Sequence, residues 1–383
     1  MKGDIAIIGI GMTKFGKHPE RSLEELGFEA AGEAMRDGGV RPTDIQAAYC
    51  ANALAPQLLG EFTMGQKIFW ELGINKIPVV NVENACTSGS TAFYLACLAI
   101  KAGAADMALV LGVEKMYTQV KKILDAGATD LETKLGFIVP GTFAMRARSY
   151  ISRYGLAPEE LALVSVKNRR HGFLNPNAQF REQVTVEDVL NSPMIADPLT
   201  RLSCCPQGDG AAAVVLCRAD MAASGYGKPV RVASSILMSG TYDNPPHLYS
   251  WPTDMRAAQK AYEEAGIGPE ELDVIELHDA FTIAELIHYE GLGLCPPGGG
   301  VELLKEGHTS LGGRIPVNPS GGLLSRGHPV GATGIAQLVE IACQLRGDAG
   351  PRQVPGAKAG MAHCMGGELQ GDTRSVTINI LTV

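Results

Sequence analysis

The stretch AAGEAMRDGGVRPTDIQAAY at residues 30–49 has a counterpart in AAQKAYEEAGIGPEELDVIE at residues 257–276. Each copy has apolar residues at helical spacing, a glycine that ends the helix, a proline that begins a turn, and an apolar strand. The two glycines are Gly39 and Gly266. The copies lie more than half of the 383-residue chain apart. This spacing predicts a chain built from two repeated units.

A second matched pair follows the first in the same order. CTSGSTAFYLACLAIKAG begins at Cys86, and HPVGATGIAQLVEIACQLRG begins at His328. Small residues at the head of each apolar helix allow close backbone approach, so we expect both helices to be buried against each other or a sheet. An apolar strand is expected after each helix, from Asp106 and near residues 357–361. Two pairs in one order favour duplication over a chance match.

Strands that alternate with helices and consist of near-continuous apolar runs predict an α/β fold with helix-covered mixed sheets. The first half is expected to span residues 1–230 and the second half residues 231–383. The first half is longer by a segment rich in charge and turns, at residues 115–205. This segment is interpreted as an inserted lobe that covers the active site or makes oligomer contacts.

Composition excludes several classes of protein. Apolar residues make up 45% of the chain, which excludes wholesale disorder. The net charge of −8 and the lack of a Lys/Arg run argue against sequence-independent nucleic-acid binding. Lys101 and Asp106 interrupt the most apolar long stretch, so no membrane span is expected, and the N-terminus has no signal-peptide cleavage pattern. Nine cysteines without a C-x-x-C motif predict reduced thiols in a cytoplasmic protein and no zinc ribbon.

Cys86 is the first candidate for chemistry. A thiol at a helix N-terminus meets the positive end of the helix dipole and free N–H groups, which favour the nucleophilic thiolate. On position alone, a buried structural cysteine is the better interpretation. The equivalent position in the second half is His328. If the halves pack about a pseudo-two-fold axis, the two helix heads meet and form a nucleophile with its base.

Two further candidates leave alternatives open. His278 ends an apolar strand, where α/β proteins place functional groups, but it could equally be a structural residue beside Asp279 as a helix cap. Cys364 precedes a glycine pair whose N–H groups could face a ligand, as in an oxyanion hole, or could form a simple turn. If this segment is extended, the neighbouring His363 points to the opposite face.

Two other patterns are weaker. Gly9 and Gly11 follow a strand but lack the third glycine of a dinucleotide-binding turn at the required spacing. The doublet Cys204-Cys205 has no nearby set of metal ligands, so core packing is the preferred interpretation.

The motifs together resemble those of the thiolase family. They are GMTKFG (11–16), NVENACTSGSTA (81–92), CCPQGDGAAAVVL (204–216), ELHDAFTIAELIHYEGLGLC (276–295), NPSGGLLSRGHPVGATG (318–334) and CMGG (364–367). The resemblance is strongest to sterol-carrier-protein-X-type thiolases and to bacterial and archaeal relatives that pair with a zinc-ribbon/OB-fold subunit. It implies a five-layered αβαβα fold from two repeated βαβαβαββ halves. It also implies a homodimer or dimer of dimers, with coenzyme A as a substrate and no permanently bound cofactor or metal.

The resemblance carries roles onto individual residues. Cys86 corresponds to the nucleophile that accepts the acyl group, and Cys364 to the acid/base that moves the α-proton. His328 of the GHP motif corresponds to the activator of Cys86 and to a donor in the first oxyanion hole, which His278 completes. The N–H groups of Cys86 and Gly366 correspond to the second oxyanion hole.

The NPSGG motif supplies the substrate-binding residues that the resemblance implies, Ser320 and Gly321. One position departs from the sterol-carrier-type pattern, which often reads HDCF. Here Ala280 gives HDAF, so the cysteine of that motif is missing, and Cys364 restores an acid/base cysteine at the other known position.

The resemblance implies an acyl-CoA C-acyltransferase that cleaves 3-oxoacyl-CoA with CoA, or runs the reverse condensation, through an acyl-cysteine. The alternatives are a thiolase-fold aldolase or lyase and a non-catalytic acyl-CoA-binding subunit. Retention of Cys86, His328 and Cys364 argues against both. An aromatic cluster within residues 238–255 either lines a pocket for a bulky acyl group, such as that of benzoylsuccinyl-CoA, or packs on the surface. Its members are Tyr242, His247, Tyr249 and Trp251.

Overall fold

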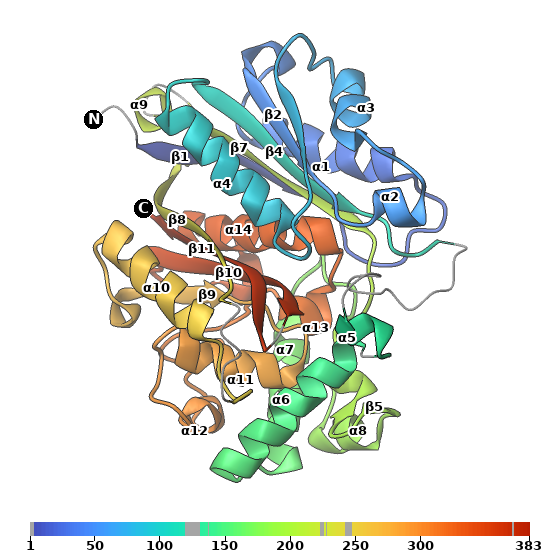
Figure 1. Cartoon of the computed structure of the whole chain (residues 1–383). Helices are drawn as coiled ribbons and strands as arrows, with labels where there is room; N and C mark the ends of the chain where they lie inside the picture. The colour runs from blue at the N-terminus through green and yellow to red at the C-terminus, as the bar shows by residue number, and fades with distance from the viewer. Residues whose placement is uncertain are drawn as a thin grey trace.

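The computed structural model describes residues 4–118, 131–136, 138–222, 226, 228–241, 247–369 and 371–383. Helices and strands alternate along most of the chain (Figure 1). The elements before residue 220 are β1 (Ile5–Met12), α1 (Leu23–Asp37), η1 (Pro42–Asp44), β2 (Ala47–Ala51), α2 (Ala55–Leu58), α3 (Met64–Glu71), β3 (Val79–Val82), α4 (Ser88–Lys101), β4 (Met107–Glu114), α5 (Leu131–Lys134), α6 (Val139–Tyr154), α7 (Pro158–Phe173), α8 (Val186–Asn191), β5 (Met194–Ala196), β6 (Leu199–Thr200), η2 (Arg201–Ser203) and β7 (Gly210–Arg218).

The second part of the chain repeats this alternation. Its elements are α9 (Ala219–Ala222), β8 (Val230–Ser239), α10 (Pro252–Ala265), η3 (Pro269–Glu271), β9 (Val274–Glu276), α11 (Thr282–Gly291), α12 (Gly300–Lys305), α13 (Gly322–Arg326), α14 (Val330–Arg346), η4 (Gly350–Arg352), β10 (Ala359–Leu369) and β11 (Asp372–Thr382). Both copies of the sequence repeat fold as a helix, a short 3₁₀ turn that begins with proline, and a buried strand.

The duplication appears in the order of the strands. The main sheet runs β3-β2-β4-β7-β1-β8-β11-β10-β9. From β2 inward, the pairings are parallel, antiparallel and antiparallel, and the same series runs inward from β9. The two series join through β1 and β8, which pair at only two positions. The prediction of an α/β fold from two repeated halves is therefore confirmed, whereas the boundary at residue 230 stays a prediction.

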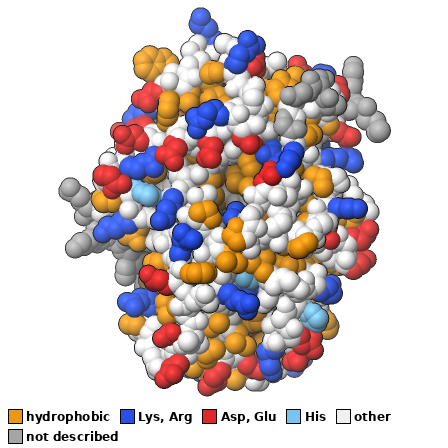
Figure 2. All heavy atoms as spheres, turned by 180° about the vertical axis from the view of Figure 1, so that it is seen from behind, with side chains coloured by type: hydrophobic (Ala, Val, Ile, Leu, Met, Phe, Trp, Pro, Cys, Tyr) orange, Lys and Arg blue, Asp and Glu red, His pale blue; other side chains and the backbone are white. Residues whose placement is uncertain are grey.

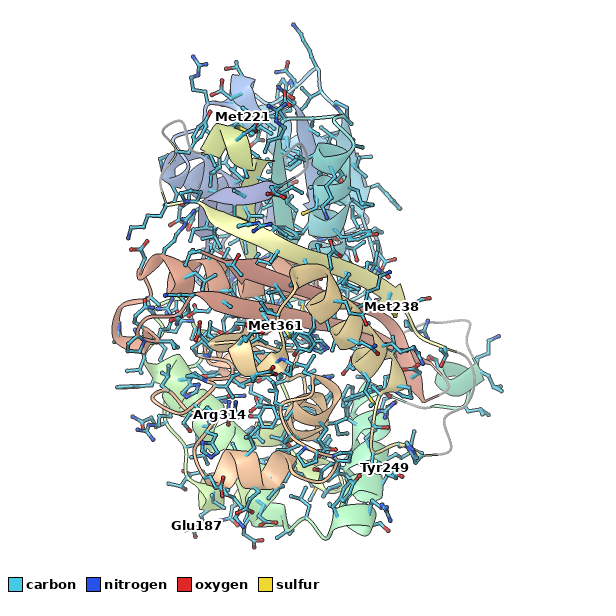
Figure 3. All side chains as sticks on the ribbon, turned by 90° about the vertical axis from the view of Figure 1, so that its left-hand side faces the viewer. Glu187, Met221, Met238, Tyr249, Arg314 and Met361 are labelled. Carbon is cyan, nitrogen blue, oxygen red and sulfur yellow. The ribbon has the colours of Figure 1, made fainter. Side chains whose placement is uncertain are left out.

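Helices and strands stack in five layers. Helix α1 covers one face of β1, β4 and β7, and α4 and α14 lie on the other face. Helix α14 also contacts β9 and β10, and α10 covers the outer face of β8 and β11. Figure 3 shows the stack from the side, with Met361 of β10 between Met221 of α9 and Glu187 of α8. The two helices that carry the predicted chemistry thus occupy the central layer.

Small residues let the central helices approach closely, as their sequences predict. A Cβ on Gly89 of α4 would lie 2.8 Å from the carbonyl oxygen of Gly331, at the head of α14. A Cβ on Gly334 would lie 2.7 Å from the backbone nitrogen of Ser90. A side chain at either glycine would therefore push the two helix heads apart.

The glycines of β1 have a structural role. A Cβ on Gly9 or Gly11 would lie within 2.3 Å of a carbonyl oxygen of helix α1, so these glycines allow α1 to pack directly on the strand. The rejection of a dinucleotide-binding turn agrees with this packing.

The segment between β4 and β7 contains α5 to α8 and the small β5–β6 sheet. Helix α7 packs against α11, α12 and α13 of the second half, and α6 packs against α11. Residues 119–130 of this segment lie outside the described residues. Its interpretation as a lobe over the active site stays a prediction.

The surface carries mixed charge. Figure 2 shows Lys/Arg and Asp/Glu side chains interspersed over the described part of the rear face. Among the described residues, no helix has both the length and the apolar character needed to cross a membrane.

Candidate active site

Cys86 lies in a tight turn between β3 and α4. The preceding residue, Ala85, has a φ of 49°, which is uncommon for a residue with a side chain. The turn is held by the Asn84 N–H, which donates to Ser88 Oγ at 2.8 Å, and by Thr87 Oγ1, which donates to the Asn84 carbonyl at 2.7 Å. Strain at Ala85 is thus maintained by bonds on both sides of the cysteine.

Two hydroxyl pairs attach this helix head to the second half. Thr87 Oγ1 lies 2.6 Å from Ser375 Oγ, and Thr377 Oγ1 donates to Ser90 Oγ at 2.6 Å. Ser375 and Thr377 belong to β11, which pairs with the strand that carries Cys364. Strand β11 therefore fixes the position of Cys86 relative to Cys364.

His328 lies at the head of α14, and its tautomer can be deduced. Thr333 Oγ1 donates its single hydrogen to the Pro329 carbonyl at 3.0 Å. The same hydroxyl lies 2.7 Å from His328 Nδ1, and with its hydrogen on the Pro329 carbonyl it accepts a hydrogen bond from Nδ1–H. The neutral ring therefore carries its lone pair on Nε2.

The two histidines and the cysteine meet at one point. Cys86 Sγ and one imidazole nitrogen each of His278 and His328 lie within 4.8 Å of one another. The His278 and His328 rings are edge-to-face, with centroids 5.2 Å apart and planes at 83°. The structure therefore brings together the helix heads that the sequence repeat pairs.

Cys364 completes the group. Its thiol donates to the carbonyl oxygen of Cys86 at 3.1 Å and lies 3.5 Å from His278 Nδ1. The adjacent His363 points away, with Nε2 3.3 Å from Asp254 Oδ1, as the alternation of an extended strand predicts. All four predicted catalytic residues thus lie together, although their catalytic roles stay predictions.

Electrostatics keep the resting group neutral. Although Cys86 as a residue is half-buried, desolvation of its thiol raises its pKa to about 12. Burial raises the pKa of Cys364 well above its ordinary value, and the nearby Cys86 raises it further. Burial lowers the pKa of His328 to about 3 and that of His278 well below its ordinary value. At neutral pH the site therefore holds thiols and uncharged imidazoles.

A glycine pair faces the nucleophile. Gly366 pairs with Ser375 in the β10–β11 ladder, whereas Gly367 has no paired position there and has a φ of 67°. A hydrogen bond from the Gly367 backbone lowers the pKa of Cys86, partly offsetting desolvation. The sequence pointed to Gly366 as an oxyanion donor, and this role stays a prediction. In the structure, the backbone group that hydrogen-bonds the Cys86 thiol belongs to Gly367, one residue beyond Gly366.

The side chain of Asp279, the neighbour of His278 in the chain, is buried and reaches a distant helix. Asp279 accepts hydrogen bonds from the N–H groups of Leu323 and Leu324, so it caps α13. The interpretation of Asp279 as the cap of the next helix is wrong, because α11 begins after Phe281 without a side-chain cap. The Asp279 carboxylate instead reaches a helix more than forty residues away in the chain, which no local pattern could indicate.

Ser320 and Gly321 have structural contacts. Ser320 Oγ donates to Glu276 at 2.7 Å, and Arg326 pairs with the same carboxylate at 2.9 Å. Gly321 has a φ of 99°, and a Cβ there would lie 2.7 Å from the Cα of Gly172. These contacts position the NPSGG turn, and the substrate-binding role of both residues stays a prediction.

Glu114 links the two halves behind the site. This fully buried carboxylate ends β4 and accepts bonds from Asn52 Nδ2, the N–H groups of Ala53 and Leu54, and the N–H of Gly331 at the head of α14. Burial raises its pKa to about 7, while these donors lower it. The sequence signal that could have indicated this linking role is the position of Glu114, an acidic residue at the end of an apolar strand.

Cys205 was also missed as a neighbour of the site. Its N–H donates to the Ala280 carbonyl at 2.9 Å, beside the position where HDCF motifs carry a cysteine. Burial raises the pKa of its thiol well above the ordinary value, with contributions from Cys204 and Cys86. The interpretation of Cys205 as mere core packing is therefore incomplete.

A second buried cluster lies behind the first. Asp254 accepts from His288 Nδ1 at 2.5 Å and contacts His363 Nε2 at 3.3 Å. Trp251 stacks on His288, with ring centroids 4.6 Å apart, and is fully buried. Neither interpretation of the aromatic cluster therefore fits Trp251, which packs in the core.

The other aromatic residues differ from Trp251. His247 stacks on Tyr249 at 3.9 Å, and Tyr249 contacts Tyr154 of the lobe at 5.7 Å between centroids. Tyr242 lies outside the described residues. A pocket lined by this cluster stays a prediction.

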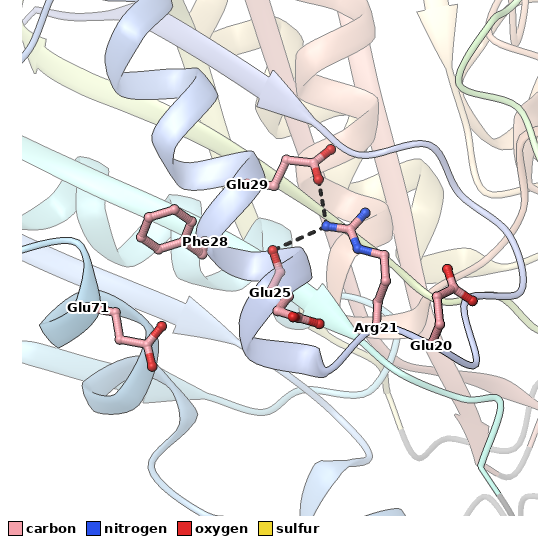
Figure 4. Close-up of a pocket in the computed structure, with 6 residues that line it drawn as sticks. All are labelled: Glu20, Arg21, Glu25, Phe28, Glu29 and Glu71. Carbon is pink, nitrogen blue, oxygen red and sulfur yellow. Dashed lines mark hydrogen bonds and ion pairs between the residues drawn. The ribbon is translucent and has the colours of Figure 1, made fainter.

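A surface hollow of about 420 Å³ lies elsewhere, at helices α1 and α3 (Figure 4). It is lined by Glu20, Arg21, Glu25, Phe28, Glu29 and Glu71. Arg21 is paired with Glu29, so the lining is dominated by carboxylates. These would repel the phosphates of an acyl-CoA, and none of the predicted catalytic residues lines this hollow.

The fold and the site define a duplicated α/β protein with a centre of two cysteines and two histidines. Family models described as "Thiolase, N-terminal domain" and "Thiolase C-terminal domain-like" match residues 5–220 and 248–379. The chain belongs to the thiolase family.

Relatives agree over nearly the whole chain. The benzoylsuccinyl-CoA thiolase subunit BbsB of Thauera aromatica is 41% identical, across 95% of this chain and 94% of that protein. An acetyl-CoA acetyltransferase of Methanothermobacter thermautotrophicus is 41% identical, across 98% and 99%. Sterol carrier protein 2 of Rattus norvegicus is 37% identical, across 94% of this chain and 70% of that protein. The predicted family is confirmed, and these relatives support CoA-dependent thiolase activity.

Solved structures give the same fold. The Ltp2-ChsH2(DUF35) aldolase matches with a TM-score of 0.85 and 25% identity, covering 98% of this chain and 97% of that one. Human mitochondrial 3-ketoacyl-CoA thiolase matches with a TM-score of 0.75 and 18% identity, covering 99% and 98%. The second likeness shows the fold alone.

Proposed function

We propose that this chain is an acyl-CoA C-acyltransferase that cleaves 3-oxoacyl-CoA with CoA, or runs the reverse condensation, through an acyl-Cys86 intermediate. The observation that carries this proposal is the meeting of Cys86, His278 and His328 within 4.8 Å, with Cys364 beside them. A nucleophile, its base and a second acid/base group are the parts this chemistry needs.

In the first step, Cys86 attacks the 3-keto carbon of the substrate, and its proton moves to His328. The deduced tautomer places the lone pair of His328 on Nε2, which can accept this proton. Because Cys86 and His328 are both uncharged at rest, charge develops on them only during the attack. The N–H groups of Cys86 and Gly366 are the proposed donors to the oxygen that becomes negative.

In the second step, the bond between the α- and β-carbons breaks and leaves the enolate of the shortened CoA ester. Cys364 donates its proton to the α-carbon, while His278 and His328 stabilise the enolate oxygen. The proton held by His328 passes to the Cys364 thiolate, which restores both groups. CoA then attacks the acyl-cysteine, and His328 accepts the CoA thiol proton and passes it to Cys86, which leaves as the free thiol. Condensation runs these steps in reverse.

The purified protein should release a shortened acyl-CoA and a new acyl-CoA from a 3-oxoacyl-CoA only when CoA is added. Chromatography of the CoA esters measures both products, and ping-pong kinetics are expected because the acyl group is held covalently between two substrates. A suitable panel contains acetoacetyl-CoA, a long-chain 3-oxoacyl-CoA and an aryl-substituted 3-oxoacyl-CoA. Carbon–carbon cleavage without CoA would contradict the proposal and favour an aldolase.

The aldolase alternative has one specific support, the TM-score of 0.85 with the Ltp2-ChsH2(DUF35) aldolase. An aldolase needs no acyl-accepting thiol, and here the thiol of Cys86 lies at the centre of the site. The presence of this thiol favours the acyltransferase.

For the substrate, we propose a bulky or aromatic acyl group of the kind found in benzoylsuccinyl-CoA. The support is the 41% identity to the Thauera aromatica subunit and the stacked His247 and Tyr249 beside the lobe residue Tyr154. The aryl-substituted 3-oxoacyl-CoA of the panel tests this choice of acyl group directly.

A homodimer or dimer of dimers is proposed through the edge of the sheet. Among the described residues, strand β3 pairs only with β2, and Val80 on it is 39% exposed. Nearby apolar side chains are also exposed, with Phe62 at 68% and Trp70 at 72%. An unpaired edge beside exposed apolar groups favours pairing with a second copy.

Light scattering should give a multiple of the mass of one chain, and Val80→Lys should shift the species toward monomer. The equivalent change at Val383, which is 60% exposed at the chain end, is the matched control. A wild-type monomer at micromolar concentration would contradict the dimer.

A zinc-ribbon/OB-fold partner subunit is also proposed. The relative BbsB is named as a subunit, and the matched aldolase structure includes a DUF35 component. The proposed binding surface for this partner is the lobe, where the apolar side chains of Leu131, Leu135 and Met194 are exposed. The proposed location is the cytoplasm, since all nine cysteines are unpaired, as in reducing compartments.

A further inference from the structure

The centre of the site contains two thiols and two imidazoles. Cys86 Sγ and one nitrogen each of His278 and His328 lie within 4.8 Å of one another, and Cys364 Sγ lies 3.5 Å from His278 Nδ1. Two cysteines and two histidines form one of the common ligand sets of tetrahedral Zn²⁺. Bond lengths of about 2.0–2.3 Å place the ligand atoms of such a site about 3.3–3.8 Å apart. Three of the four ligand atoms lie within 4.8 Å of one another, and Cys364 joins this group through its contact with His278.

His328 is already oriented as a metal-binding histidine would be. Its Nδ1–H donates to Thr333 Oγ1, which leaves the Nε2 lone pair free. A hydrogen bond of this kind on the far nitrogen fixes the ring and strengthens metal binding.

Cys86 is the most exposed residue of the group. Cys86 is half-buried, whereas His278, His328 and Cys364 are buried, so an ion would enter past Cys86.

We propose that Cys86, His278, His328 and Cys364 form a reversible Zn²⁺ site that holds the protein in an inactive state. Each thiol gives up one proton when the metal binds, and the metal–sulfur bonds replace the two S–H bonds. Bound metal removes both the nucleophile and its base, so acyl-CoA and Zn²⁺ exclude each other. The metal binding is independent of the proposed function, whereas the inhibition depends on it.

The second cluster, formed by Asp254, His288 and His363, is a weaker metal site. All three residues are 0% exposed. The two carboxylate oxygens of Asp254 are each engaged by one imidazole, and His288 is covered by Trp251. Metal entry there would require opening of the core, so this cluster provides the internal comparison.

Cobalt(II) is the spectroscopic probe of the proposed site. Titration of the metal-free full-length protein should give one equivalent of bound Co²⁺, with intense visible bands of tetrahedral geometry and a near-ultraviolet thiolate-to-cobalt band. Zn²⁺ should displace the cobalt and abolish the colour. Cys86→Ser and His278→Asn should each weaken binding by more than about 100-fold, since a lost ligand costs more than the 10–100-fold of a lost outer partner.

Thr333→Val tests the outer contact, with an expected loss of about 10–100-fold in affinity. His288→Gln in the second cluster and Cys97→Ala in α4 are the controls, and both should bind Co²⁺ as the wild type does. Circular dichroism of every variant checks folding. No charge-transfer band, or a band that survives Cys86→Ser, would overturn the site, as would loss of binding in His288→Gln. Zn²⁺ binding without inhibition of a demonstrated thiolase would overturn the inactive state alone.

Discussion

Replacement of Cys86 by alanine is expected to lower kcat by at least about 10⁴-fold, as removal of a nucleophile does in other covalent enzymes. The fold should survive, because Cys86 is half-buried and the turn around it is held by Asn84, Thr87 and Ser88. Intact-protein mass spectrometry after brief exposure to an acyl-CoA should show one acyl group on the wild type and none on the variant.

The matched control is Cys97→Ala, which removes a thiol from helix α4, the helix that follows Cys86, without touching the centre of the site. Peptide mapping should place the acyl group of both the wild type and this control on Cys86. An adduct on Cys205 or Cys364 instead, or turnover by the Cys86 variant, would rule out the assignment of the nucleophile.

Replacement of Cys364 by alanine should separate the two cysteines by role. Its thiol is needed only where a proton moves on or off carbon, so the variant should still exchange acyl groups between CoA thioesters through Cys86. Carbon–carbon cleavage should fall by about 10²–10⁴-fold, the range for loss of a general acid–base group. Exchange of α-protons with deuterated water, followed by NMR, should fall with it.

A different result would assign the proton to another group. His278 Nδ1 lies 3.5 Å from the Cys364 sulfur, so His278 or a bound water could also reach the α-carbon. Near wild-type α-proton exchange in Cys364→Ala would mean that Cys364 only shapes the turn before Gly366. A matched Cys343→Ala variant, with its thiol in helix α14, checks for effects of simple thiol loss.

The parts of the site that follow from the repeat could be predicted from the sequence. Cys86 and His328 occupy equivalent positions in the two halves, and a pseudo-two-fold arrangement brings equivalent positions together. His278 and Cys364 could be ranked only through the family motifs, because the end of a strand and a glycine pair are common features. Their close contact at 3.5 Å depends on strand pairing between distant segments.

The supporting contacts could not be predicted, because they depend on partners far apart in the chain. Thr333 fixes the His328 tautomer through a local bond, yet a threonine in a helix has many possible roles. Asp279 reaches the start of α13, and Trp251 is covered by Arg146 and His288. Local periodicity indicates which face of an element is apolar, but not which polar group on a distant element it will meet.

The contacts of Glu114 have a consequence for how the protein unfolds. Its carboxylate takes hydrogen bonds from the first half, and also from Gly331, where the second half begins its central helix. If the second half melted alone, the carboxylate would lose a partner worth about 1.5–3 kcal/mol, and the apolar faces of α4 and β4 would meet water. We therefore expect neither half to fold as an independent unit, despite their repeated sequence. Heating should produce one calorimetric transition, in which the van't Hoff and calorimetric enthalpies agree.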